Sequence, residues 1–228
     1  MRQSLLKLLP AHVQASTRLL EALTHRSAGS RHNERLEYLG DSVLNFIIAE
    51  HLYRHLPQAS EGDLSRLRAS LVNKDALALI ARDYGLGEVI HLGQGELKSG
   101  GFRRDSILAD TLEAIIGAVY LETDFASAQQ FVIRLYANRL ANLPSAESLK
   151  DPKTRLQEYL QEKGFPVPQY ELQDITGKPH EQHFRALCLI HSHDLKAIGE
   201  GSSRRKAEQA AAAQILEKLQ AQTQVYSN

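Results

Sequence analysis

Three carboxylates recur at helical spacing in one short segment, 33–42, which reads NERLEYLGDS. They belong to Glu34, Glu37 and Asp41, at positions i, i+3 and i+7, so a helix would align them on one face over two turns. Like charges at this spacing destabilise a helix by roughly a few tenths of a kcal/mol per pair, a cost that a bridging cation would reverse. The leucines between the acids indicate that this face is not simply solvated. The segment is therefore a candidate for binding a metal ion.

A second acidic pair lies in the segment 107–117, which reads ILADTLEAIIG. Asp110 and Glu113 are again three positions apart, and almost all of their neighbours are apolar, which predicts a largely buried helix. A buried carboxylate needs a charged partner or a metal ion, because burying an unpaired charge is very costly. Two such helices indicate one shared cation site, and ligands that are all oxygen select a hard ion, magnesium or manganese. Such an ion can hold a phosphate oxygen and lower the pKa of a bound water for attack on phosphorus.

Ordinary ion pairs are the alternative explanation for these acids. Arg35, Arg103 and Arg104 are the candidate partners. Ion pairing is the better explanation for a single acid pair, but it is less satisfactory for five acids distributed over apolar helices. The sequence leaves both explanations open.

Helices must position these acids, and the first part of the chain has a helical apolar period up to about residue 140. Ser60 followed by Asp63 resembles a capping box that opens one of these helices. Between residues 84 and 104, six glycines predict a long irregular loop, and such loops are more often functional than accidental. The helices that the spacing predicts cover 36–47, 60–72, 107–119 and 125–140.

The pattern changes after the segment 143–150, which has no period, contains Pro144 and is predicted to be a linker. Phe184, Ala186 and Cys188 then alternate onto one face of a predicted strand. We therefore predict two domains, an all-α domain over 1–142 and a small α+β domain of order α-β-β-β-α over 151–221. The elements predicted for the second domain are a helix at 152–163, strands at 167–175, 183–190 and 195–198, and a helix at 203–219.

Composition limits the partners and the location of the chain. The 27 basic and 27 acidic residues cancel, which argues mildly against nucleic-acid binding, so local clusters of charge must support any such function. The single cysteine, Cys188, cannot form a disulfide within the chain and favours a reducing compartment, so we expect a cytoplasmic protein. No apolar run approaches the ~20 residues of a membrane span, and the start is too short for a signal peptide, so no membrane association is expected. Gly199 and Gly201 do not complete a dinucleotide motif, and no organic cofactor is expected.

The acidic segments resemble the hallmark motifs of the ribonuclease III family. The motifs are 33–42, the sequence GELKSGG at 95–101, and 107–117, and the similarity extends from about Leu8 to Leu219. The resemblance implies the ribonuclease III fold for the catalytic first domain, with Asp41 and Glu113 essential for catalysis. It also implies that the acids of the metal site are Glu37, Asp41, Asp110 and Glu113.

Two further acids, Glu34 and Glu61, match the catalytic valley of the family. The resemblance implies that each contacts the substrate or the metal. Glu61 has a competing explanation, because it follows the expected N-cap Ser60, where an acid favours the helix dipole.

The second domain resembles a double-stranded-RNA-binding domain in three regions. One face of its first predicted helix carries polar side chains that can hydrogen-bond 2′-hydroxyls in the minor groove. The loop GKPH at 177–180 is similar to the family's loop that enters a second minor groove. The run GEGSSRRKA at 199–207 opens the last helix, where a helix N-terminus and three cations would converge on phosphates. The implied RNA contacts are Thr154, Gln157, Glu158, Lys178, His180, Ser203, Arg204, Arg205 and Lys206.

Glu208 departs from the pattern of this domain, because many of its members have another lysine at this position. The change removes one phosphate contact and is expected to weaken binding by the isolated domain. Recognition itself should follow the A-form shape of the duplex rather than its sequence.

The resemblance implies an endonuclease that hydrolyses double-stranded RNA to 5′-phosphate and 3′-hydroxyl ends, with magnesium as cofactor and manganese as a substitute. One set of acids cuts one strand, so staggered cuts on both strands of a two-fold symmetric duplex imply a homodimer. The expected substrates are precursors of ribosomal RNA and other structured transcripts, messenger and transfer RNA included. The alternative is a non-catalytic regulator that only binds duplexes, but such a protein gains nothing from carboxylates that face phosphate.

Overall fold

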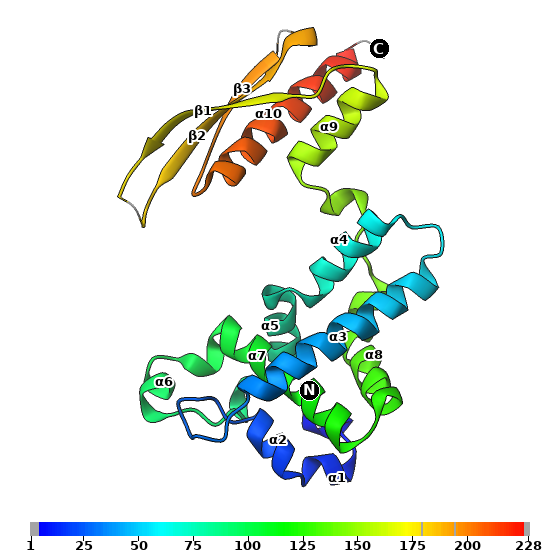
Figure 1. Ribbon diagram of the computed structural model, residues 1–228, viewed down its shortest axis with the longest axis vertical. Helices are drawn as coiled ribbons and strands as arrows, with labels where there is room; N and C mark the ends of the chain where they lie inside the picture. Colours follow the sequence, from blue (N-terminus) through cyan, green and yellow to red (C-terminus); the bar gives the residue numbers. More distant parts are fainter. Residues whose placement is uncertain (1–4, 179, 194, 226–228) are drawn as a thin grey trace. The chain divides into compact units, whose positions relative to one another are not determined.

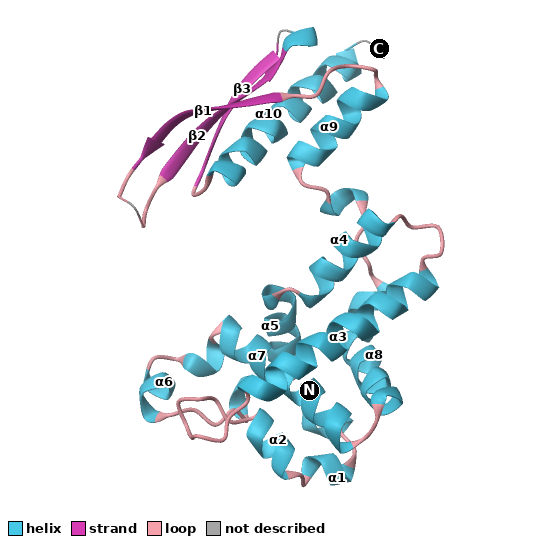
Figure 2. Ribbon diagram, in the orientation of Figure 1, coloured by secondary structure: helices cyan, strands magenta, loops and turns pink. Residues whose placement is uncertain are grey.

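The chain folds into a helical unit followed by a smaller unit built on a β-sheet. The computed structural model describes residues 5–178, 180–193 and 195–225, and the two units are Met1–Leu149 and Lys150–Asn228. All strands that the structure describes belong to the second unit (Figures 1 and 2). The predicted succession of an all-α domain and a small α-β-β-β-α domain is confirmed.

The first unit consists of α-helices joined by short 3-10 turns. Its helix starts follow the local sequence, and at Ser60 the hydroxyl oxygen accepts a hydrogen bond from the backbone N–H of Asp63 at 3.2 Å, as the predicted cap requires. The α-helices are α1 (Ala11–Gln14), α2 (Thr17–Ala22), α3 (Glu34–His55), α4 (Glu61–Val72), α5 (Lys74–Asp83), α6 (Gln94–Lys98), α7 (Asp105–Glu122) and α8 (Phe125–Ala141). The 3-10 helices are η1 (Leu5–Leu8), η2 (Leu86–Glu88), η3 (Gly101–Arg103) and η4 (Glu147–Leu149).

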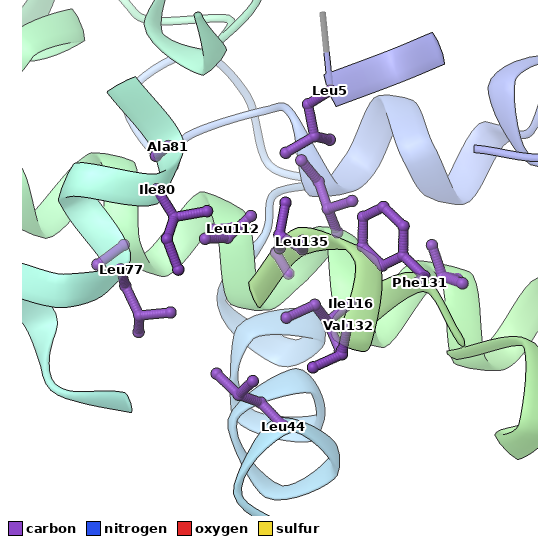
Figure 3. Packing of buried hydrophobic residues seen from close by; sticks show 14 of the residues in the cluster. Leu5, Leu44, Leu77, Ile80, Ala81, Leu112, Ile116, Phe131, Val132 and Leu135 are labelled. Carbon is purple, nitrogen blue, oxygen red and sulfur yellow. The ribbon is translucent and has the colours of Figure 1, made fainter. Parts of the chain in front are cut away.

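Helix α7 is the central element of this unit. Its residues are apolar nearly all round, which is typical of a helix buried on every side. Figure 3 shows Leu112 and Ile116 of α7 among Leu44 of α3, Ile80 of α5 and Val132 of α8. A carboxylate in the middle of α7 therefore lies close to a tightly packed apolar core.

The glycine-rich segment, predicted as an irregular loop, contains the short helices η2, α6 and η3. Glycine is needed where this segment approaches other backbone. A Cβ atom at Gly87 would lie 2.3 Å from the carbonyl oxygen of Phe102, and one at Gly93 would lie 2.2 Å from that of Ser27. These glycines therefore pack the segment closely on its neighbours.

Residues 143–149, most of the predicted linker 143–150, pack with the first unit. Helix α8 ends at Ala141, and Leu143, Ala146 and Leu149 then contact the apolar core of this unit. Ala146 and Leu149 are three residues apart, and the backbone N–H of Leu149 donates to the carbonyl oxygen of Ala146 at 3.2 Å, so the short helix η4 places both on the same side.

The second unit packs two helices on one face of an antiparallel sheet of order β1-β2-β3 (Figure 2). Alternate residues of β2, among them Ala186, Cys188 and Ile190, point into the core as predicted. The core is completed by Leu156 and Leu160 of α9 together with residues of α10. The elements are α9 (Pro152–Glu162), β1 (Gln169–Thr176), β2 (His183–Ile190), β3 (Leu195–Gly201) and α10 (Arg204–Val225), with a 3-10 turn, η5 (His191–His193), before β3.

None of the described helices combines the length and the apolar composition that crossing a membrane would need.

Candidate metal centre and nucleic-acid interface

Two glycines allow the acid-bearing helices α3 and α7 to touch backbone to backbone. A Cβ atom at Gly40 would lie only 1.8 Å from the carbonyl oxygen of Glu113, and one at Gly117 would lie 2.4 Å from that of Leu36. No side chain larger than hydrogen fits at either position. The crossing places the turn of α3 that carries Glu37 directly beside the acidic turn of α7.

Three carboxylates converge at this crossing. Glu37 of α3 and Asp110 and Glu113 of α7 each offer one oxygen, and these oxygens lie within 4.8 Å of one another. All three residues are half-buried. Oxygen ligands at this separation suit a hard divalent cation, so the residues fit the metal ion that the sequence predicts.

The electrostatics of the three acids support the same conclusion. Burial, followed by the charges of Asp41, Glu37 and Asp110, raises the pKa of Glu113 to about 8. Burial and then the Asp110 charge raise the pKa of Glu37, and burial raises the pKa of Asp110. Three acids that are difficult to ionise together form a site that a divalent cation would stabilise.

Ion pairing does not explain this cluster. Among the described residues, no lysine or arginine forms an ion pair with any of its three acids. Of the partners considered, Arg104 binds Glu96 at 2.5 Å, and the guanidinium of Arg103 lies 5.0 Å from the centroid of the Phe102 ring. The described structure therefore favours the metal site over the ion pairs.

Asp41 lies beside the cluster but is turned toward its own helix. Its side-chain oxygen accepts a hydrogen bond from Nδ2 of Asn45 at 2.7 Å, and Arg68 of α4 in turn donates to Oδ1 of Asn45 at 3.0 Å. Its charge still contributes to the raised pKa of Glu113. Sequence reasoning missed Asn45 and Arg68, although the i, i+4 spacing of Asp41 and Asn45 is a visible signal.

The two additional acids occupy different places. Glu34 is exposed on the first turn of α3 and pairs with Arg26 at 3.3 Å. Glu61 opens α4, where it accepts a hydrogen bond from the Ser65 hydroxyl at 2.8 Å. The structure brings Glu34 to the edge of the acid cluster, whereas Glu61 of the same chain lines a separate hollow with Phe46 and Tyr53.

An open cleft of about 890 Å³ adjoins the acid cluster. Asn33, which is buried, donates a hydrogen bond to the Thr111 hydroxyl at 3.5 Å and so connects the start of α3 with α7. Neither residue was identified from the sequence. The cleft is lined by His25, Arg26, Ser27, Asn33, Glu34, Glu37, Glu96, Arg104, Ser106, Ile107 and Asp110.

The residues predicted to contact nucleic acid are all at least partly exposed in the second unit. On α9, Gln157 and Glu158 are exposed, and Glu158 pairs with Lys150 at 2.5 Å. In the turn between β1 and β2, Lys178 and His180 are exposed, and the intervening Pro179 lies outside the described residues. Thr154 is half-buried and donates a hydrogen bond to Oδ2 of Asp151 at 3.4 Å.

The last helix begins at a cluster of cations. Arg204, Arg205 and Lys206 are exposed in its first turn, and Ser203 accepts a hydrogen bond from the backbone N–H of Lys206 at 3.3 Å. Gly199 of β3 allows the start of this helix to pack closely on the sheet, because a Cβ atom there would lie 2.3 Å from the carbonyl oxygen of Ala207. The described structure thus presents helix N–H groups and three cations at one surface.

Comparisons with known proteins identify both units. Residues 152–219 match the model of the double-stranded RNA binding motif, and residues 16–140, more than half of the chain, match a family model described as Ribonuclease-III-like. The chain is 54% identical over 202 residues to Ribonuclease 3 of Proteus mirabilis (strain HI4320), which covers 89% of each protein. This chain belongs to the ribonuclease III family.

Other members of the ribonuclease III family agree with this assignment. Ribonuclease 3 of Vibrio cholerae is 55% identical over 198 residues, covering 87% of this chain and 88% of that protein. A solved nuclease domain of ribonuclease III from Campylobacter jejuni is 45% identical, with a TM-score of 0.53, and covers 54% of this chain and 87% of that chain. The chain is therefore an endoribonuclease for double-stranded RNA, as the sequence predicted.

Proposed function

We propose that this chain hydrolyses both strands of an RNA duplex at the acid cluster, with magnesium held by Glu37, Asp41, Asp110 and Glu113. The observation that carries the proposal is the convergence of three half-buried carboxylate oxygens within 4.8 Å of one another. When bound, the ion would polarise a phosphate oxygen and supply a hydroxide at neutral pH, and manganese could replace it. The products would have 5′-phosphate and 3′-hydroxyl ends, with staggered cuts.

Asp41 and Glu113 are the acids that we propose as catalytic. With a pKa of about 8, Glu113 retains a proton near neutral pH until a cation enters the cluster. Asp41 would join the other ligands through Oδ2, while its Oδ1 stays hydrogen-bonded to Nδ2 of Asn45. Asn45 and Arg68 thus set how easily Asp41 reaches the reacting phosphate.

A second copy of the chain is the partner that we propose for the first unit. Three aromatic side chains of α3 are exposed, Tyr38 at 79%, Phe46 at 58% and Tyr53 at 72%, at a spacing that aligns them along one helix face. The described residues of each chain contain one such acid cluster, and a two-fold dimer would supply a second cluster for the second strand. The Campylobacter jejuni structure is described as showing flexibility in a region involved in dimer formation, which agrees with this proposal.

The dimer would also give Glu61 a role in the catalytic valley. Glu61 lines a hollow of about 440 Å³ with Phe46 and Tyr53 of the aromatic face. In a symmetric dimer formed through that face, Glu61 of each chain would lie at the interface. Its contact with the valley therefore depends on the partner copy, whereas Glu34 acts within its own chain.

The second unit would hold the duplex through three regions. Thr154, Gln157 and Glu158 of α9 would contact one minor groove, and Lys178 and His180 a second. At the start of α10, the phosphate contacts would come from Ser203, Arg204, Arg205 and Lys206. The natural substrates that we propose are structured precursors of ribosomal RNA, with messenger and transfer RNAs, in the cytoplasm.

A cleavage assay tests the proposal directly. The purified chain is incubated with an end-labelled RNA duplex in magnesium, in manganese and in EDTA, and the products are resolved on a gel. We expect cutting in both metals and none in EDTA, with Asp41→Asn and Glu113→Gln inactive. Glu122→Gln is the matched control, because Glu122 ends the same helix and pairs with Arg18 at 2.8 Å outside the site. Duplex binding without cutting in either metal would instead identify a non-catalytic RNA-binding regulator.

A further inference from the structure

Glu208 is a buried carboxylate in a surface that should be basic. It lies on the second turn of α10 and is only 8% exposed. Both of its oxygens are engaged, Oε2 with Nζ of Lys153 at 2.6 Å and Oε1 with Nε of Arg204 at 2.8 Å. Burial alone would raise its pKa, but the hydrogen bonds from Lys153 and Arg204 lower the pKa overall. Glu208 is therefore ionised at neutral pH.

The charge of the cation cluster is reduced by its own anions. Lys153 and Arg204 share Glu208, and Arg205 lies 3.7 Å from Oδ2 of Asp151. The two carboxylates thus offset part of the positive charge of four cations at the junction of α9 and α10, which are Lys153, Arg204, Arg205 and Lys206. A phosphate that approaches this junction meets less positive charge than the sequence RRK suggests.

Glu208 nevertheless leaves Arg204 able to bind a phosphate. The carboxylate engages Nε of Arg204, while the Arg204 side chain remains 61% exposed. Lys153 is held more firmly, because its Nζ also lies 4.2 Å from the centroid of the Tyr170 ring and its side chain is 33% exposed. The cations are present and oriented, and what Glu208 takes away is mainly charge.

We infer that Glu208 limits the affinity of the second unit for the RNA backbone, because its ionised carboxylate opposes phosphates at the start of α10. The inference rests on the duplex binding proposed above. The competing explanation is structural, with Glu208 serving only to fasten α9 to α10.

Equilibrium binding of the full chain to a 30-base-pair RNA duplex in EDTA, where no cutting occurs, tests the inference. Glu208→Gln removes the charge and keeps one hydrogen-bond acceptor. We expect affinity about threefold to tenfold tighter at low salt, and a steeper dependence of log K on log salt by about 0.7–0.9, equivalent to one added phosphate contact. A purely structural role would leave the salt dependence unchanged.

Glu217→Gln is the matched control. It makes the same change of net charge at an exposed position further along α10, and we expect less than about a twofold change in affinity. Circular dichroism and thermal unfolding establish which variants are folded. If Glu208→Gln does not fold, Glu208→Met tests the same point, because replacing a buried ion-pair member by an apolar residue of similar volume is often tolerated.

The outcomes are distinct. A folded variant at position 208 that binds no more tightly than wild type, or only as tightly as Glu217→Gln, overturns the inference. A wild-type chain that does not bind the duplex even at low salt overturns the proposed duplex binding itself. Tighter binding with a steeper salt dependence at position 208 alone supports the inference.

Discussion

Glu113 and Glu208 are both carboxylates withdrawn from water, yet their surroundings shift their pKa values in opposite directions. Glu113 lies among other acids, and burial together with their charges raises its pKa to about 8. Glu208 has two cations on its two oxygens, and its pKa is lowered despite burial. A cation from solution would stabilise the ionised form of the first site, whereas the second site is stabilised by cations of the same chain. A carboxylate that lacks a partner marks a site for an external ion.

The largest expected effect comes from placing a side chain between the two acid-bearing helices where their backbones touch. Gly40→Ala would place a Cβ atom 1.8 Å from the carbonyl oxygen of Glu113, so α3 and α7 must separate. We expect the first unit to lose about 3 kcal/mol or more of its free energy of unfolding. Urea denaturation followed by circular dichroism measures the loss.

Gly95→Ala is the control for this substitution, because no atom lies within 4 Å of a Cβ at Gly95. Its unfolding should match wild type within about 0.5 kcal/mol. Equal stability of Gly40→Ala and Gly95→Ala would show that the acid cluster does not depend on the backbone contact.

Neutralising the two carboxylates should change stability in opposite directions. In the metal-free protein at pH 8, Glu113→Gln removes repulsion that is partly screened by water, and should stabilise the fold by about 1–2 kcal/mol. Glu208→Gln weakens two ion pairs and should destabilise the second unit by about 1–2 kcal/mol. Urea denaturation in EDTA measures both effects. A change of the same sign in the free energy of unfolding of the two variants would contradict the expected difference between the sites.

The pH dependence follows from the same difference. The folded chain binds a proton at Glu113 more tightly than the unfolded chain does, so metal-free stability should fall as the pH rises from about 4.5 to about 8. The lowered pKa of Glu208 has the opposite sign, and its contribution should be lost on acidification. Denaturation of Glu113→Gln at several pH values should show a flatter profile above pH 5 than wild type.

Magnesium should reverse the destabilisation at the first site alone. At saturating magnesium and pH 8 we expect the melting temperature of the helical unit to rise by roughly 5 °C, and by less at pH 6, where protons compete for the same oxygens. Differential scanning calorimetry measures the shift. The rise should be absent in Glu113→Gln, and an equal rise at both pH values would contradict the raised pKa values.

The smallest expected effect concerns the orientation of Asp41. Asn45→Ala removes the hydrogen bond to Asp41 and the acceptor for Arg68, so the carboxylate is less well positioned. We expect about a tenfold lower cleavage rate with unchanged duplex binding in EDTA. Asn138→Ala, at an exposed position on α8, should cleave at the wild-type rate. A cleavage rate for Asn45→Ala equal to that of the control would show that Asn45 does not position Asp41 for catalysis.

The sequence predicted what depends on local spacing. The i, i+3 intervals placed Glu37 and Asp110 on helices, and the apolar neighbours of Glu113 correctly indicated that its carboxylate is withdrawn from water. The hydrogen bond that turns Asp41 onto Asn45 was not predicted, because rotamers respond to neighbours from other helices.

Residues that meet only in the folded chain were the hardest to predict. Glu208 was predicted as a missing phosphate contact, but its burial between Lys153 and Arg204 requires α9 and α10 to pack together. The sequence likewise could not predict that Glu61 lies apart from Glu37, since this depends on where α4 begins relative to α3.

The contact at Gly40 and Gly117 also has a consequence for ion size. Because backbone touches backbone, the separation of α3 and α7 is fixed by atoms that have no rotamers. A small ion such as magnesium takes oxygens at ~2.0–2.1 Å, and calcium at ~2.3–2.6 Å. Moving the helices apart for the larger ion would give up this backbone packing, so rotation of the carboxylates is the less costly adjustment. The close crossing of α3 and α7 therefore favours the smaller ion.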